Sequence, residues 1–149
     1  MSGGTALAVA MTTVAGLAGS VQVAVMGRFG ERIGVFEALA FATLLTAIFS
    51  SVVLLIARQS VSAYADGMRA PLWLWSAGVM GLIVILSITF ATPRIGATAT
   101  IGILIAGQLA MGTVIDRFGL LGLERIPIGP WRLLGIGLLA VGAALSLKK

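Results

Sequence analysis

PLWLWSAGVMGLIVILSITFATPRIGATATIGILIAGQLAMGTVI occupies residues 71–115 and contains one charged side chain, that of Arg94. On each side of Arg94 the apolar run has about 20 residues, the length that an α-helix needs to cross the hydrocarbon core of a bilayer. A transmembrane β-barrel would instead show segments of about ten residues with alternating polarity. The stretch therefore predicts two membrane-spanning helices.

The rest of the chain has the same character. Of its 149 residues, 59% are hydrophobic and 10% are charged, against about 25% charged in an ordinary soluble domain. We therefore expect an all-α integral membrane protein, with residues 1–149 forming a single transmembrane domain. No Lys or Arg precedes the first apolar run, so we expect a retained helix rather than a cleaved signal. Five spans are predicted, at residues 5–26, 35–57, 71–91, 97–115 and 131–147.

The connections between these spans are predicted from Gly, Pro and charged residues. We expect a tight polar turn at residues 27–32, a hydrophilic loop at 58–69 and a turn at 93–96, where Pro93 lacks a backbone donor. Pro127 and Pro130 precede the fifth span. That span is the shortest, and Lys148 and Lys149 at its end favour a true crossing because they can reach the headgroups.

Several classes of function are excluded by composition. The chain has no Cys and no His, which excludes disulfides, thiolate chemistry and imidazole metal sites; we expect no metal and no cofactor. The net charge is +5, but the basic residues stand singly at the ends of apolar runs, so we expect lipid headgroups rather than nucleic acid as their partners. No nucleophile–base pair is apparent, so enzyme activity is not expected.

The basic residues give no instruction about orientation. With five crossings, each side of the membrane receives five Lys and Arg residues: Arg58, Arg69, Arg117, Arg125 and Arg132 on one side, and Arg28, Arg32, Arg94, Lys148 and Lys149 on the other. Orientation normally follows an excess of these residues on the cytoplasmic side. Either the balance is chance and another feature fixes topology, or copies insert in both orientations. An odd number of helices suits the second explanation, because two opposite copies would form a ten-helix antiparallel homodimer like the inverted repeats of transporters. A parallel homodimer and a monomer are the alternatives.

Polar residues inside the spans are the candidates for a substrate pathway. Gln108 lies near the middle of the fourth span and Gln22 nearer the end of the first. Each amide has two readings, a hydrogen bond between helices or a pore-facing group that holds a polar ligand. The other candidates are Ser20, Thr12, Trp73 and Ser87.

Glu37 is the one carboxylate that could lie within a span. Residues 38–57 already suffice to cross, so Glu37 can sit at headgroup level near Arg32 or at the helix N-terminus. The alternative is a coupling role, in which a buried carboxylate binds proton and cation in turn. Asp116 is expected to be a boundary residue, either solvated or paired with an arginine.

Small residues recur every four positions in the first and fourth spans, and share a face in the fifth. Such faces allow close approach of two helices. The expected packing residues are Gly16, Gly102, Ala106, Gly135 and Gly142.

Several motifs resemble those of the YdcZ-like family, a branch of the drug/metabolite transporter superfamily. The likeness lies in the tryptophan-containing start of the third span, in Pro93-Arg94-Ile95-Gly96-Ala97, in Ala106-Gly107-Gln108-Leu109, in Asp116 with Phe118-Gly119, and in Val21-Gln22 with Arg28. It covers nearly the whole chain. One departure is Met26, where the family often has asparagine.

The resemblance implies a five-helix protein of the bacterial inner membrane that acts as an exporter. It also implies kinship with small multidrug resistance proteins, which work as antiparallel dimers. Their essential first-helix glutamate has no counterpart here, so their proton-coupled mechanism cannot be transferred. We expect a homodimeric transporter of small, partly apolar metabolites or organic ions that works by alternating access. The alternatives are a membrane scaffold or subunit without transport activity, and a passive dual-topology channel.

Overall fold

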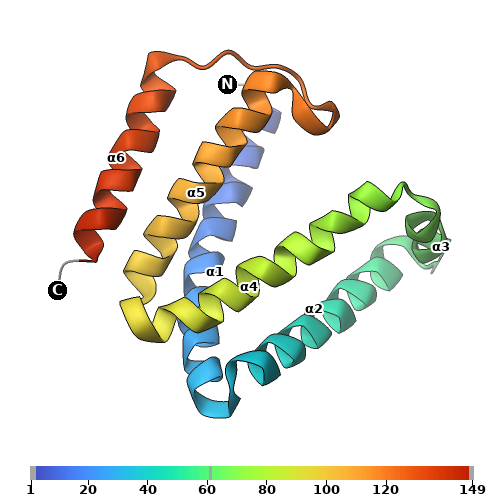
Figure 1. Ribbon diagram of the computed structural model, residues 1–149. Coiled ribbons are helices and arrows are strands. Elements are labelled where there is room, and N and C mark those ends of the chain that lie inside the picture. Colours follow the sequence, from blue (N-terminus) through green and yellow to red (C-terminus); the bar gives the residue numbers. More distant parts are fainter. Residues whose placement is uncertain (1–2, 61, 148–149) are drawn as a thin grey trace. The chain divides into compact units, whose positions relative to one another are not determined.

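The computed structural model describes residues 3–60 and 62–147, and in this part of the chain all regular structure is helical (Figure 1). The elements, in chain order, are α1 (Gly3–Ile33), α2 (Val35–Arg58), α3 (Ser62–Arg69), η1 (Leu72–Trp75), α4 (Ser76–Ile95), α5 (Ala97–Phe118), η2 (Leu120–Gly122) and α6 (Pro130–Ser146).

Four helical segments are long and apolar enough to cross a membrane: α1, α2, η1 with α4, and α5. They match the first four predicted spans, with the third beginning at Leu72 instead of Pro71. The fifth predicted span corresponds to α6, which has 17 residues and is therefore about 25 Å long. A typical hydrocarbon core is about 30 Å thick, so α6 falls short of a full perpendicular crossing.

The turn predicted at residues 27–32 is wrong, because α1 continues through it to Ile33. Gly27 and Gly30 are buried in the helix, where glycine permits close packing, and Arg28 pairs with Glu31 one turn later at 2.8 Å. The real break is Gly34, whose φ of 105° is open to glycine but not to residues with a side chain. At 31 residues, α1 extends about 46 Å, so its charged end can project beyond the hydrocarbon.

The turn predicted at 93–96 is also displaced, since Pro93 lies inside the last turn of α4 and the helix ends at Ile95. A proline so close to the C-terminus removes one hydrogen bond without breaking the earlier turns. The break is Gly96, with φ 83° and ψ 159°. The tripeptide Arg-Ile-Gly thus ends both α1 and α4, and the next helix begins directly after each glycine.

The loop predicted at 58–69 contains the two-turn helix α3. The Tyr64 hydroxyl is hydrogen-bonded to that of Ser51 on α2. The Trp75 indole N–H donates to the carbonyl of Gly67 at 3.2 Å. These contacts tie α3 to the end of α2 and the start of the next apolar segment.

The structure divides into two compact units, one formed by Met1–Ala24 with Ala91–Lys149 and the other by Val25–Phe90. In the first unit, α5 packs on α6, and a Cβ added to Gly102 would lie 3.2 Å from the Cβ of Ala143. In the second unit, Gly30 of α1 packs tightly against Thr89 of α4. The aromatic rings of Phe29 and Phe41 pack edge to face there, with their centroids 5.7 Å apart. In each unit, a glycine thus stands at a close contact between two helices.

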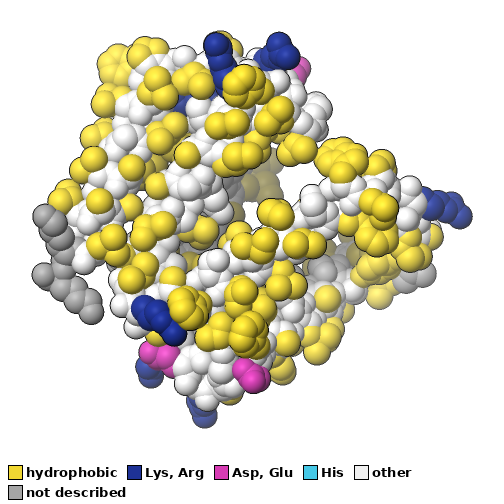
Figure 2. Space-filling view, viewed as in Figure 1, with side chains coloured by type: hydrophobic (Ala, Val, Ile, Leu, Met, Phe, Trp, Pro, Cys, Tyr) yellow, Lys and Arg dark blue, Asp and Glu magenta, His cyan; other side chains and the backbone are white. Residues whose placement is uncertain are grey.

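The sides of the helices are apolar and largely uncovered. Figure 2 shows hydrophobic side chains along the visible helices, with charged groups gathered at the helix ends. Large side chains such as Phe36 and Trp131 are 72% and 82% exposed. In water this surface would drive aggregation; against lipid tails it is the expected exterior of a membrane protein.

Candidate functional site

The predicted pathway residues are distributed over both units, so the structure describes them in two groups. Thr12, Ser20 and Gln22 on α1 and Gln108 on α5 belong to the first unit, and Glu37, Trp73 and Ser87 belong to the second. Within each group, the residues differ in whether their polar side chains already form hydrogen bonds.

The hydroxyl candidates are satisfied by their own helices. Thr12 donates to the carbonyl of Ala8 at 2.8 Å, Ser20 to that of Gly16 at 3.0 Å, and Ser87 to that of Ile83 at 2.8 Å. Such bonds to the preceding turn let a hydroxyl face an apolar surrounding at little cost. These three residues therefore need no ligand to explain their presence.

The two amides behave differently. Both Gln22 and Gln108 are exposed, and neither side chain makes a hydrogen bond within the described part of the chain. Gln108 is near the centre of the 22-residue helix α5, where water is absent in a bilayer. A primary amide left facing hydrocarbon costs roughly 4–8 kcal/mol on a cyclohexane scale. Among the predicted pathway residues, Gln108 is thus the polar group at mid-span whose hydrogen bonds are left unmade within the described chain.

Glu37 lies in the first turn of α2 and is exposed. Its carboxylate folds back over Gly34, so close that a Cβ on Gly34 would collide with it. The positive end of the helix dipole favours a negative charge there. This position favours the interfacial role for Glu37, and the coupling role stays a prediction. Trp73 is exposed in η1, at the start of its apolar segment.

The predicted packing residues differ in their surroundings. Gly102 contacts Ala143 of α6, and Ala106, one turn further along α5, is half-buried. Beyond the adjoining residues of its own helix, a Cβ at Gly16, Gly135 or Gly142 would meet no other described residue within 4 Å. These three glycines present open surface, and their use in packing stays a prediction.

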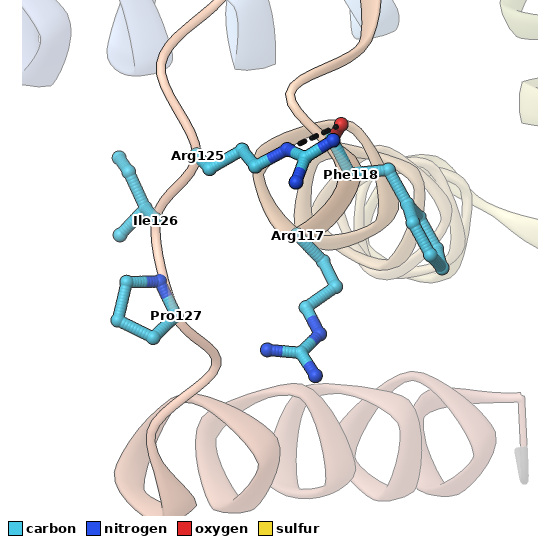
Figure 3. A pocket seen from close by; sticks show the side chains of 5 residues that line it. All are labelled: Arg117, Phe118, Arg125, Ile126 and Pro127. Atoms are coloured by element: carbon cyan, nitrogen blue, oxygen red, sulfur yellow. Dashed lines mark hydrogen bonds between the residues drawn. The ribbon is translucent and has the colours of Figure 1, made fainter.

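Charged residues at the end of α5 form a site that the sequence did not predict. Asp116 forms an ion pair with Arg132 at 2.7 Å and accepts a backbone hydrogen bond from Ile126 at 2.9 Å. The arginine pairing expected for Asp116 is thus confirmed. Around it, a pocket of about 400 Å³ is lined by Arg117, Phe118, Arg125, Ile126 and Pro127; we call it the α5 pocket (Figure 3).

Two further features lacked a clear signal in the sequence. The contact of Gly30 with Thr89 joins residues 59 positions apart in the sequence. The glycine and charged residues around Gly30 are typical of a turn, so they did not indicate a packing contact inside a helix. Thr92 has a buried hydroxyl with no hydrogen-bond partner in the described chain. A buried hydroxyl usually bonds to the preceding turn, as Thr89 does to Ile85 at 2.7 Å, so only coordinates could show the exception.

Long apolar helices, exposed hydrophobic sides and charges confined to helix ends define a multi-pass α-helical membrane protein. The family model described as "Putative inner membrane exporter, YdcZ" matches residues 7–145, and the chain belongs to that family. This family is one of membrane transporters rather than enzymes, and its members reside in the inner membrane. No curated protein and no solved structure matches the chain.

Proposed function

We propose that the protein exports small, partly apolar metabolites or organic ions by alternating access, as a homodimer of two copies in opposite orientations. The family supplies the exporter assignment. The balanced distribution of basic residues supports insertion in both orientations, because it gives no preference to either side. The substrate site would lie between the copies, near the bilayer midplane.

The exposed amide of Gln108 is the observation that carries this proposal. The side chain lies halfway along α5 and has no partner in the described chain. A residue at mid-span keeps the same depth when the molecule is turned over. Two opposite copies therefore bring both Gln108 amides to one level, where they can line a shared cavity and hold the polar group of a substrate. Gln22, which is also exposed, would add a second amide from α1.

Introduced cysteines test the arrangement directly, because the chain has none of its own. A cysteine at Ser60, in the connection between α2 and α3, should be labelled by an impermeant maleimide from both sides of the membrane. A cysteine at Gln108 should join two copies through a bis-maleimide. The matched control is Ala110, also exposed but two residues further along and so about 200° around the helix. Labelling of Ser60 from one side alone would refute opposite orientations.

Transport is tested in liposomes loaded with labelled organic cations and carboxylic acids. Gln108→Ala should lower saturable efflux by about 5- to 150-fold, because a lost hydrogen bond in a dry site costs about 1–3 kcal/mol, whereas Ala110→Val should leave it unchanged. Unsaturable flux far faster than a carrier cycle would indicate a channel instead. Absence of flux together with stable copurification of another chain would indicate a scaffold or subunit.

A further inference from the structure

The α5 pocket combines two cationic side chains with an apolar wall. Arg117 and Phe118 come from the last turn of α5, and Arg125, Ile126 and Pro127 come from the connection to α6. In Figure 3 the Arg117 side chain extends toward α6, while Arg125 reaches across the end of α5. The proposed transport pathway uses neither arginine, and the predicted topology uses them only as charges.

The positive charge of this pocket is not neutralised by the nearby carboxylates. Asp116 is engaged with Arg132 at 2.7 Å, and Glu124 is exposed and does not line the pocket. Within the described chain, Arg117 makes no hydrogen bond or ion pair. The pocket therefore keeps an excess of cationic groups.

Arg125 is held in place while its charge remains available. Its Nε donates to the carbonyl of Phe118 at 3.3 Å, and its terminal nitrogens make no hydrogen bond within the described chain. The carbonyls at a helix C-terminus carry partial negative charge that would repel an anion. By covering one of them, Arg125 reduces that repulsion and leaves the edge of its guanidinium free for a ligand.

We propose that the α5 pocket binds the phosphate group of an anionic phospholipid. Guanidinium groups match phosphate oxygens in geometry and charge. The pocket lies where a membrane-length helix ends, which is headgroup depth, and basic pockets at this depth between helices bind lipid phosphates. Ile126 and Pro127 supply apolar surface that suits the glycerol and first methylenes of a lipid better than free phosphate. This site does not depend on dimerisation or transport, since all its residues come from one copy.

Thermal unfolding in an uncharged detergent tests the proposal with three probes: short-chain phosphatidylglycerol, short-chain phosphatidylcholine and inorganic phosphate. The phosphatidylglycerol should stabilise the protein in a saturable manner, far more than the zwitterionic lipid does. In Arg117→Gln/Arg125→Gln its apparent affinity should fall about 30-fold, as expected for two basic groups near a phosphate. The matched control is Arg58→Gln/Arg69→Gln, which removes two arginines at the ends of α2 and α3 and should bind as the wild type does.

Each outcome decides the question. Equal stabilisation by both lipids, or equal losses in the two double variants, would overturn the proposal. Stabilisation by inorganic phosphate at the same concentration as phosphatidylglycerol would overturn the lipid source in favour of a soluble phosphate ligand. Arg117→Lys/Arg125→Lys separates binding from folding: it keeps both charges, so partial recovery of affinity supports a direct contact with phosphate.

Discussion

Gly30 shows how a single missing side chain sets the contact between α1 and α4. Thr89, which is fully buried, places its Cγ2 only 2.5 Å from the position that a Cβ on residue 30 would occupy. In an open helical position, replacing Gly with Ala stabilises by up to about 1 kcal/mol. At Gly30 the collision outweighs this gain, because forcing an extra methyl into a packed contact costs about 1–3 kcal/mol.

We expect Gly30→Ala to lower the free energy of unfolding in detergent by about 1–3 kcal/mol. Gly19→Ala on the same helix, where nothing lies within 4 Å, should be neutral or slightly stabilising. Thr89→Ser removes the colliding Cγ2 and keeps the hydroxyl, so the double variant Gly30→Ala/Thr89→Ser should recover most of the loss in a double-mutant cycle. Additive effects in that cycle would contradict the packing described here.

The candidate site illustrates what residue types alone can and cannot predict. The sequence identified Gln108 as an amide inside a span, and the structure adds that the amide is exposed and has no partner in the described chain. The sequence also indicated Thr12 and Ser87 as candidates, and in the structure their hydroxyls donate to carbonyls of their own helices. In the sequence, a hydroxyl and an amide are both simply polar side chains within an apolar run. They differ in structure because the short Ser and Thr hydroxyls hydrogen-bond to a carbonyl of the preceding helical turn.

At the scale of elements, the existence of the helices and the starts of α2 at Val35 and α5 at Ala97 followed from the sequence, but the ends of α1 and α4 did not. The four long segments match the first four predicted spans, because hydrophobic length is a property of the sequence itself. The composition of residues 27–32 predicts a turn, but a helix can continue through charged residues once it leaves the hydrocarbon. α1 and α4 end where Gly34 and Gly96 adopt positive φ angles. The Arg-Ile pair before each glycine is itself helical and gives no separate signal for the end.

Gly96 provides a test of this role for glycine. Its φ of 83° with ψ of 159° lies in a region that is essentially restricted to glycine, at a cost of about 1–3 kcal/mol for other residues. Apart from its two chain neighbours, no described residue lies within 4 Å of a Cβ added to Gly96, so the expected loss is due to the backbone. Gly96→Ala should lower the free energy of unfolding by that amount, measured by reversible unfolding in detergent. Gly107→Ala, in the interior of α5 and also in open space, is the control and should cause no loss.

For the whole molecule, topology depends on the shortest helix. The balance of five basic residues on each side requires α6 to cross the membrane, which places Lys148 and Lys149 opposite Arg117, Arg125 and Arg132. If α6 lay in the interface instead, both lysines would join the latter group, and the distribution would become seven against three. A seven-to-three excess would direct a single orientation with the N-terminus in the cytoplasm. The distribution of the two orientations therefore reports whether α6 crosses the membrane: a mixed population indicates a crossing α6, and a single orientation indicates an interfacial α6.

Removing Arg58 and Arg69 tests how orientation depends on the number of basic residues on each side of the membrane. With five crossings, Arg58→Gln/Arg69→Gln leaves three basic residues against five, so most copies should place their C-terminus in the cytoplasm, whereas the wild type should divide between the two orientations. Arg58→Lys/Arg69→Lys keeps both charges and should divide as the wild type does. Labelling of a cysteine at Ser60 from each side gives the two populations. With four crossings, the same removal leaves five against three, and the population would keep its N-terminus in the cytoplasm in both the wild type and the variant, which would rule out the antiparallel pair.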